Sequence, residues 1–140
     1  MLSTKKILVI DDDPESLSVT RACLLQEGYY VITASSGVEG LAKVGERNPD
    51  MVMIDTMLSD MSWSDVARSL RTDSSYEHLP IVALANPDRL DEFVIGSDSY
   101  VDDLLVKPFS PSDLVVKVLP LLGAEEQRKR TVVSTGNGEL

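Results

Sequence analysis

The order of short apolar runs along the chain constrains the fold more than any other feature. Five such runs recur, at residues 7–10, 29–32, 51–54, 81–85 and 104–106. Most are continuously apolar rather than alternating, which is typical of strands that are covered on both faces in a parallel sheet. We therefore predict five buried strands.

Stretches in which apolar residues recur with helical spacing separate these runs. The first begins after Pro14, a natural first-turn residue, and ends at Gly28. It carries Val19, Ala22 and Cys23 at helical spacing, and Leu17, Leu24 and Leu25 widen the apolar stripe. The other stripes are Val38, Leu41, Ala42 and Gly45; Trp63, Val66, Ala67 and Leu70; the weaker Leu90, Phe93 and Val94, ended by Gly96; and Val115, Val118, Leu119 and Leu122. We expect Pro120 to kink or end the last helix, since proline lacks the helical N–H donor.

A strand followed by a helix, five times over, calls for right-handed crossovers and a parallel sheet with helices on both faces. We expect an α/β fold of the flavodoxin-like, doubly wound (βα)5 type, with strand order 2-1-3-4-5. A chain of 140 residues is long enough for one domain. We assign this domain to residues 1–123 and interpret residues 124–140 as a charged helix extension followed by a flexible tail or linker.

Charge and composition narrow the classes of partner. The formal net charge of −10 opposes phosphate backbones and argues against direct nucleic-acid binding by this segment. The apolar runs are too short to span a bilayer and no signal-like leader is visible, so we expect a cytoplasmic protein with no membrane partner. Cys23 is the single cysteine, which excludes an internal disulfide and favours a small core residue.

Acidic residues and one lysine follow three of the predicted strands. Asp11, Asp12 and Asp13 come after the first strand, Asp55 after the third and Lys107 after the fifth. Ligands of doubly wound sheets bind beyond the carboxyl ends of the strands, where the strand order reverses. Converging carboxylates repel one another unless a cation lies among them, and Mg²⁺ prefers oxygen ligands. The pattern therefore predicts a Mg²⁺ site at this edge, with Asp13 left to cap the following helix.

Such a site suits phosphoryl transfer. An aspartate beside a bound cation, here Asp55, can attack a phosphoryl donor and become an aspartyl phosphate. The reaction needs mainly positioning and neutralisation of charge on the equatorial oxygens, which Lys107 and Mg²⁺ could supply.

Four segments carry a resemblance to a known family. The stretches "KKILVIDDDPES", "PDMVMIDTMLSDM", "LPIVALAN" and "VDDLLVKPFSPSDL" occur in this order, and over residues 4–122 the chain resembles the receiver domain of two-component response regulators, of the chemotaxis-regulator type. The resemblance implies that Asp55 is the phosphoacceptor, Asp12 a direct Mg²⁺ ligand and Asp11 a ligand through water. It also implies that the backbone carbonyl of Met57 completes the metal shell and that Lys107 contacts the phosphoryl group.

The same resemblance implies a cis peptide bond between Lys107 and Pro108. It implies partners as well: a sensor histidine kinase or a phosphotransfer protein as donor, and a downstream protein or a linked output domain as target, with a homodimer left open. Receivers catalyse their own phosphorylation and dephosphorylation, so turnover of an independent substrate is not expected.

The chain departs from the family pattern at the positions that report phosphorylation. Ala85 stands where the family carries Thr or Ser, whose hydroxyl binds the phosphoryl group, and Leu104 stands where it usually has an aromatic. Residues 58–63 lack the Pro and Gly of the family loop, and Tyr100 replaces a common Gly. We therefore expect a receiver with intact chemistry and altered switch coupling.

Two other functions stay open. One is a pseudo-receiver, a protein-binding module whose partner contacts ignore phosphate. The other is a phosphatase of the haloacid dehalogenase type, because Asp11-x-Asp13 follows a strand; Glu15 stands where that motif has Thr or Val. His78 lies in a loop without a kinase-type motif and is interpreted as a solvated residue, and Trp63 as a core residue rather than a binding hot spot.

Overall fold

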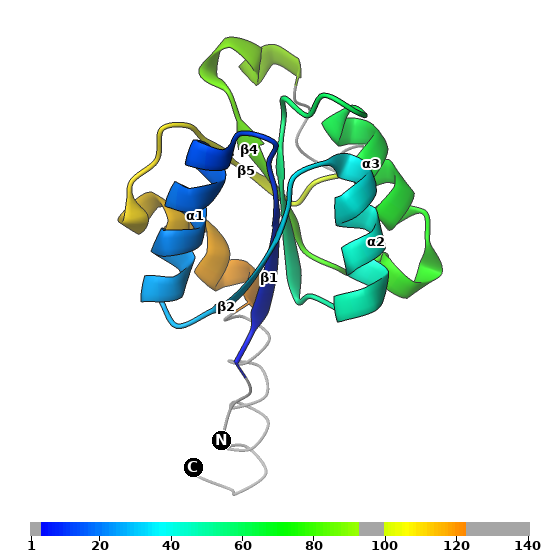
Figure 1. The fold of residues 1–140 in the computed structure, drawn as a ribbon, viewed down its shortest axis with the longest axis horizontal. Helices are drawn as coiled ribbons and strands as arrows, with labels where there is room; N and C mark the ends of the chain where they lie inside the picture. Colours follow the sequence, from blue (N-terminus) through cyan, green and yellow to red (C-terminus); the bar gives the residue numbers. More distant parts are fainter. Residues whose placement is uncertain (1–3, 93–99, 123–140) are drawn as a thin grey trace, which may run out of the picture.

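The computed structural model describes residues 4–92 and 100–122. Five parallel strands form one sheet in the order β2-β1-β3-β4-β5 (Figure 1). The strands are β1 (Lys6–Ile10), β2 (Tyr30–Ala34), β3 (Met51–Asp55), β4 (Ile81–Ala85) and β5 (Asp103–Val106). The predicted fold class and strand order are therefore confirmed, and the strand bounds differ from the predicted runs by two residues at most.

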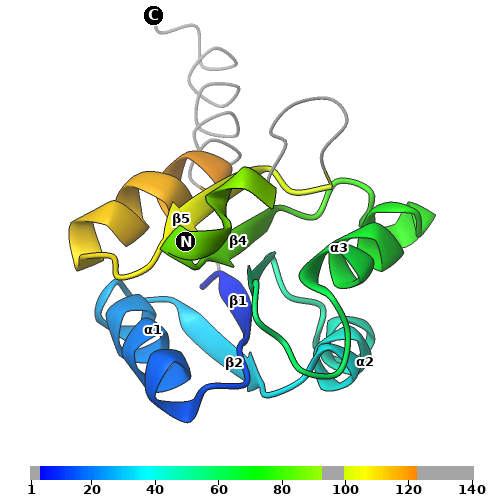
Figure 2. The same ribbon diagram turned by 90° about the horizontal axis from the view of Figure 1, so that it is seen from above.

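Helices cover both faces of the sheet. The α-helices are α1 (Pro14–Gln26), α2 (Gly37–Arg47) and α3 (Trp63–Arg71), and residues 111–122 form a further helix. Two short 3-10 helices, η1 (Ser74–Tyr76) and η2 (Pro87–Glu92), flank β4. Figure 2 shows α1 and the helix of residues 111–122 on one side of the sheet, with α2 and α3 on the other.

Short polar side chains start the helices. Asp13 caps α1, since its Oδ1 atom accepts the N–H of Glu15 at 3.2 Å, as predicted. Ser36 caps α2 and Ser62 caps α3 in the same way. At the other end of α2, Asn48 takes the left-handed conformation with φ of 49° and closes the helix before β3.

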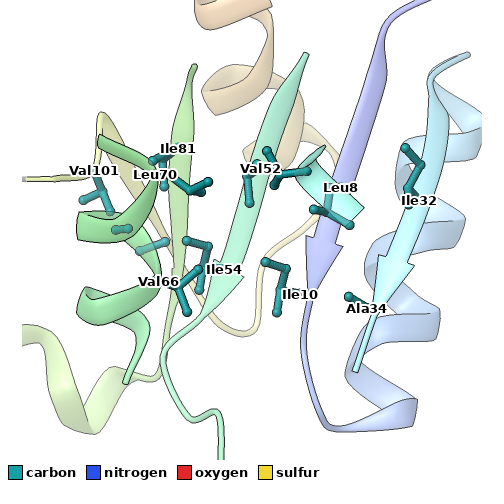
Figure 3. Packing of buried hydrophobic residues seen from close by; sticks show 13 residues of the cluster. Leu8, Ile10, Ile32, Ala34, Val52, Ile54, Val66, Leu70, Ile81 and Val101 are labelled. Atoms are coloured by element: carbon teal, nitrogen blue, oxygen red, sulfur yellow. The ribbon is translucent and has the colours of Figure 1, made fainter. Parts of the chain in front are cut away.

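The sheet separates two hydrophobic clusters because successive strand residues point to opposite faces. On the α2 and α3 side, β1, β3 and β4 contribute Leu8, Ile10, Val52, Ile54, Ile81 and Ala83 (Figure 3). On the α1 side the same strands contribute Ile7, Val9, Met51, Met53, Val82 and Leu84. All of these strand residues are fully buried, which explains the continuously apolar runs in the sequence.

The buried faces of two helices differ from prediction. In α1 Leu24 is buried as the apolar stripe predicted, but Thr20 is buried beside it and Val19 is 54% exposed. In the last helix Val118 and Leu122 are buried as predicted, but Leu114 is buried with them and Leu119 is 53% exposed. Both helices have apolar residues on more than one face, so spacing alone did not decide which face meets the sheet. Residues 111–122 are helical throughout, so Pro120 does not end the helix, and a kink at Pro120 stays a prediction.

Two further predictions lie partly or wholly outside the described residues. The weak helix expected around Leu90 is a 3-10 helix, η2, as far as residue 92; Phe93, Val94 and Gly96 lie outside the described residues. The proposed extension and tail of residues 124–140 also lie outside them.

Candidate active site

The carboxyl ends of the two central strands bring the predicted acidic residues together. Strands β1 and β3 are hydrogen-bonded neighbours, although β2 lies between them in sequence. Asp11 follows β1 and Asp55 ends β3, so both lie at the point where the strand order reverses. Asp11, Asp12 and Asp55 each offer a carboxylate oxygen, and these three oxygens lie within 4.8 Å of one another.

Lys107 reaches this cluster from the end of β5. Its Nζ atom donates to Asp11 Oδ2 at 3.0 Å and to Asp55 Oδ1 at 2.5 Å. It also donates to the hydroxyl of Ser16 in α1, at 2.6 Å. The peptide bond between Lys107 and Pro108 is cis, as the resemblance implied. One ammonium group thus joins two strand-end carboxylates and the first turn of α1.

Both aspartates at the strand ends are nearly closed to solvent, at 0% exposure for Asp11 and 5% for Asp55. Burial raises the pKa of the Asp55 carboxyl, and the neighbouring charge of Asp11 adds to the rise, while the hydrogen bond from Lys107 opposes it. Burial lowers the pKa of Lys107, but its hydrogen bonds to Asp55 and Asp11 outweigh this, so the pKa of the ammonium is raised overall. A site of this kind favours an added cation.

The donor set fits Mg²⁺. Three carboxylates supply hard oxygen atoms, of which Mg²⁺ needs only one or two beside its water molecules. The Asp55 Oδ2 atom already accepts the N–H of Met57 at 2.9 Å, which holds the carboxylate in one orientation. The role of the Met57 carbonyl as a metal ligand stays a prediction.

Comparison with known proteins agrees with this geometry. Residues 7–119 match the family described as the response regulator receiver domain. The chain belongs to this family. Receivers of two-component systems accept a phosphoryl group on an aspartate, bind Mg²⁺ at an acidic site, and interact with histidine kinases and output domains.

Curated relatives of this receiver are longer transcription regulators. It is 36% identical over 136 residues to the DNA-binding response regulator MtrA of Mycolicibacterium smegmatis, covering 97% of this chain and 58% of the relative. It is 35% identical over 122 residues to the alkaline phosphatase synthesis transcriptional regulatory protein PhoP of Bacillus subtilis, covering 87% of this chain and 50% of the relative. The chain therefore spans about half the length of these relatives.

Solved structures show the same fold. A response regulator of Chloroflexus aurantiacus has a TM-score of 0.81 at 27% identity, covering 86% of this chain and 99% of that one. The response regulator TrrA of Thermotoga maritima, solved in complex with Mg²⁺ and BeF, has a TM-score of 0.75 at 31% identity, covering 85% and 100% of the two chains. Among the helices described in this receiver, none is long and apolar enough to cross a lipid bilayer.

The two atypical switch positions lie on neighbouring strands. Ala85 ends β4 and is fully buried. Leu104 pairs with Ala83 in the sheet register and is partly buried against the cluster on the α3 side. Beside them, the N–H of Asn86 donates to the hydroxyl of Thr56 at 3.3 Å. Thr56, the residue that follows β3 and the phosphoacceptor candidate, is therefore joined to the residue that follows Ala85.

Several residues near the site were missed by sequence reasoning. Ser16, Thr56 and Ser59 each make a hydrogen bond with a site residue or its neighbour. Ser16 and Thr56 had only a hydroxyl side chain near a predicted acidic position as a signal, which is too common to select them. Ser59 was visible only as a departure from the proline of the family loop, and it contacts Asp12 through its backbone N–H.

The other residues noted in the sequence face solvent or make contacts that stabilise the fold. His78 is exposed in the loop before β4, and Trp63 packs, partly buried, against the core cluster. Asp102 accepts the N–H of Ile81 at 2.8 Å, and Asp103 pairs with Lys117 at 3.0 Å.

Proposed function

We propose that this receiver accepts a phosphoryl group on Asp55 in a Mg²⁺-dependent reaction. The observation that carries the proposal is the convergence of three carboxylates and Lys107 at the strand-order reversal. Asp11, Asp12 and the Met57 carbonyl are the proposed metal ligands beside Asp55. When bound, Mg²⁺ would neutralise charge on the phosphoryl oxygens.

In the proposed step an Asp55 oxygen forms a bond to phosphorus while the bond from phosphorus to the donor's leaving group breaks. The leaving group is an imidazole when the donor is a phosphohistidine, and acetate when it is acetyl phosphate. Lys107 pairs directly with Asp55, and its positive charge would stabilise the extra negative charge of the aspartyl phosphate. Ser16 holds the ammonium from the α1 side.

The proposed donor is a sensor histidine kinase or a phosphotransfer protein. A cavity of about 420 Å³ opens beside the site, and Ser16, Val19, Lys107 and Phe109 are among its lining residues. The exposed apolar side chain of Val19 lies there next to the polar groups of the site, which suits a protein surface that presents a phosphorylated side chain. The proposed target is a downstream protein or an output domain linked to the receiver.

We further propose that phosphorylation of Asp55 is coupled to the output surface in a different way from that of the family pattern. A hydrogen bond to a charged group contributes about 1.5–3 kcal/mol, and Ala85 cannot donate one to a phosphoryl group. Leu104 has no polar tip or planar ring whose rotation would report that bond. Amide exchange with and without beryllofluoride tests this idea, and we expect little change in β5 and in residues 111–122. A large change there would contradict it.

The alternative is a pseudo-receiver that binds partners without phosphate. Trp63 and Met57 line the same cavity of about 460 Å³, so Trp63 fluorescence can report events in the β3–α3 loop. The receiver proposal predicts a saturable change in fluorescence with Mg²⁺ that is reduced in Asp12→Asn. A pseudo-receiver predicts no saturable change, and also no phosphoryl adduct on Asp55 from acetyl phosphate.

A further inference from the structure

The loop between β3 and α3 is fastened at two neighbouring residues. The backbone N–H of Ser59 donates to Asp12 Oδ2 at 3.1 Å. The next residue, Asp60, accepts from the start of α2: its Oδ1 takes the N–H of Gly37 at 2.9 Å and its Oδ2 the N–H of Val38 at 3.0 Å. A segment that follows Asp55 is thus joined to a proposed metal ligand on one side and to a helix on the other.

Side-chain packing holds the same contact between loop and helix. A Cβ atom added to Gly37 would lie 2.4 Å from Met61 Cγ and 2.8 Å from its Sδ, which is too close for any larger residue. Met61 itself packs, partly buried, against the core cluster. The backbone of α2 therefore approaches the loop as closely as the chain allows.

The start of α2 has caps of its own. Ser36 Oγ accepts the N–H of Glu39 at 3.0 Å, and Glu39 Oε1 accepts the N–H of Ser35 at 2.7 Å. The two bonds to Asp60 come in addition to these two capping bonds, and they lower the pKa of the Asp60 carboxyl. Asp60 therefore adds to the capping of α2 and joins the loop to the helix.

The hydrogen bond from Ser59 to Asp12 is possible because position 59 departs from the family pattern. The family commonly has proline at this position, and proline carries no N–H. In this chain the N–H occupies one oxygen of Asp12 and leaves the other oxygen for a metal. Hydrogen bonds of this kind orient carboxylate ligands, and their loss typically weakens metal binding 10- to 100-fold.

We propose that Asp60 is a positioning residue for the Mg²⁺ site, acting through the Ser59 N–H on the orientation of Asp12. Asp60 fixes the loop against α2, the loop presents the Ser59 N–H, and that N–H holds Asp12 toward Asp11 and Asp55. The inference rests on the proposed Mg²⁺ site and goes beyond it, because Asp60 touches neither the metal ligands nor the phosphoacceptor in the described contacts.

The test compares Mg²⁺ dissociation constants by isothermal titration calorimetry. Asp60→Asn removes one of the two acceptor oxygens, and we expect Mg²⁺ binding about 10-fold weaker than in the wild type. Asp65→Asn removes the same charge from α3, where Asp65 pairs with Arg68 on the surface, and should leave the constant unchanged. An Asp60→Asn variant that binds Mg²⁺ as the wild type does would overturn the inference.

A double-mutant cycle tests the route through Ser59. Ser59→Pro deletes the N–H, and the Asp60→Asn effect on Mg²⁺ binding should vanish in that background. A full effect of Asp60→Asn in the Ser59→Pro background would contradict the proposed route.

Amide exchange of Ser59 in metal-free protein separates this inference from the proposed function. We expect faster exchange of this amide in Asp60→Asn and unchanged exchange in Asp65→Asn. A wild type that binds no Mg²⁺ would refute the proposed function, and the Ser59 exchange rate would then still decide whether Asp60 holds the loop. An exchange rate equal to that of the wild type would refute the positioning role.

Discussion

The Nζ atom of Lys107 lies 2.5 Å from Oδ1 of Asp55, although 52 positions separate the two residues in sequence. The same ammonium is 3.0 Å from Asp11 Oδ2, so one cation compensates two carboxylates that are closed to solvent. Among the contacts described, Lys107 is the basic side chain that reaches both. This arrangement makes stability and metal binding depend on each other.

Replacing Lys107 by methionine should therefore destabilise the metal-free protein. Two buried carboxylates would lose their cation, and we expect the free energy of unfolding to fall by about 1–3 kcal/mol in EDTA. Mg²⁺ should restore part of the loss because it supplies the missing charge. Urea denaturation with and without Mg²⁺ measures both effects.

Lys117→Met is the matched control, because Lys117 pairs with Asp103 at 3.0 Å in a more exposed setting, with side chains 34% and 38% exposed. Its loss should be below about 1 kcal/mol and independent of Mg²⁺. Equal losses for the two lysine variants would show that Asp11 and Asp55 do not need the ammonium.

Gly40 in α2 lies against β1 so closely that a side chain cannot be added without movement. A Cβ atom there would lie 2.3 Å from Ile10 Cδ1, a fully buried atom. We expect Gly40→Ala to lower the free energy of unfolding by about 1–3 kcal/mol through overpacking. Thermal denaturation checks this.

Gly45 on the same helix provides the contrast. A Cβ atom there has Tyr76 Oη as its nearest neighbour, at 3.9 Å. Gly45→Ala should raise the free energy of unfolding by about 0.5–1 kcal/mol, because alanine favours the helix more than glycine does. Destabilisation by both alanines to the same degree would contradict the close packing of α2 on β1.

Arg71 ties the end of α3 to the start of β4 and β5. Its guanidinium donates to the carbonyl oxygens of Glu77 and Leu79, at 3.0 and 2.7 Å, and to Asp102 Oδ2 at 2.9 Å. We expect Arg71→Ala to cost about 1–3 kcal/mol in urea denaturation. Arg71→Lys should rescue little of it, because one ammonium cannot reproduce the guanidinium fork. Full rescue by lysine would show that charge alone matters.

Glu39 makes stability depend on pH at the start of α2. The N–H of Ser35 and the ammonium of Lys43 lower the pKa of its carboxyl from the ordinary value of 4.5. A lowered pKa contributes stability that is present above the ordinary value and is lost as pH falls through the folded-state value.

Glu39→Gln should therefore cost about 0.5 kcal/mol at pH 7, a small figure because the side chain is 40% exposed and its pair is screened. The difference between variant and wild type should disappear at acid pH, because glutamine keeps the hydrogen bond to Ser35 and lacks only the charge. Urea midpoints of the variant and the wild type, measured from pH 7 to pH 3, test whether the stability difference disappears. A constant difference across this range would contradict the role of the charge.

The positions of Asp11, Asp55 and Lys107 could be predicted because one topological rule brings strand ends together. Their order along the chain was enough, since parallel strands place their carboxyl ends at one edge. The contact of Ser59 with Asp12 could not be predicted in this way. It depends on the path of an irregular loop, and the two residues are 47 positions apart.

The buried faces of the helices were only partly predictable, for a different physical reason. In α1, Leu17, Val19 and Ala22 surround much of the helix with apolar side chains, so several faces were equally plausible. Only packing against the sheet chose the face of Thr20 and Leu24. The close approach at Gly40 was equally invisible, since a helical glycine looks like a weak helix former until its neighbour Ile10 is known.

The central claim is that Asp55 is the phosphoacceptor, and acetyl phosphate labelling tests it most directly. The protein is incubated with acetyl phosphate and Mg²⁺, and intact mass spectrometry detects the addition of one phosphoryl group. Asp13→Asn is the matched control, because Asp13 caps α1 at the surface and asparagine caps a helix equally well. We predict an adduct in the wild type and in Asp13→Asn, and none in Asp55→Asn or without Mg²⁺. An adduct that persists in Asp55→Asn, or its absence from the wild type, would contradict the account.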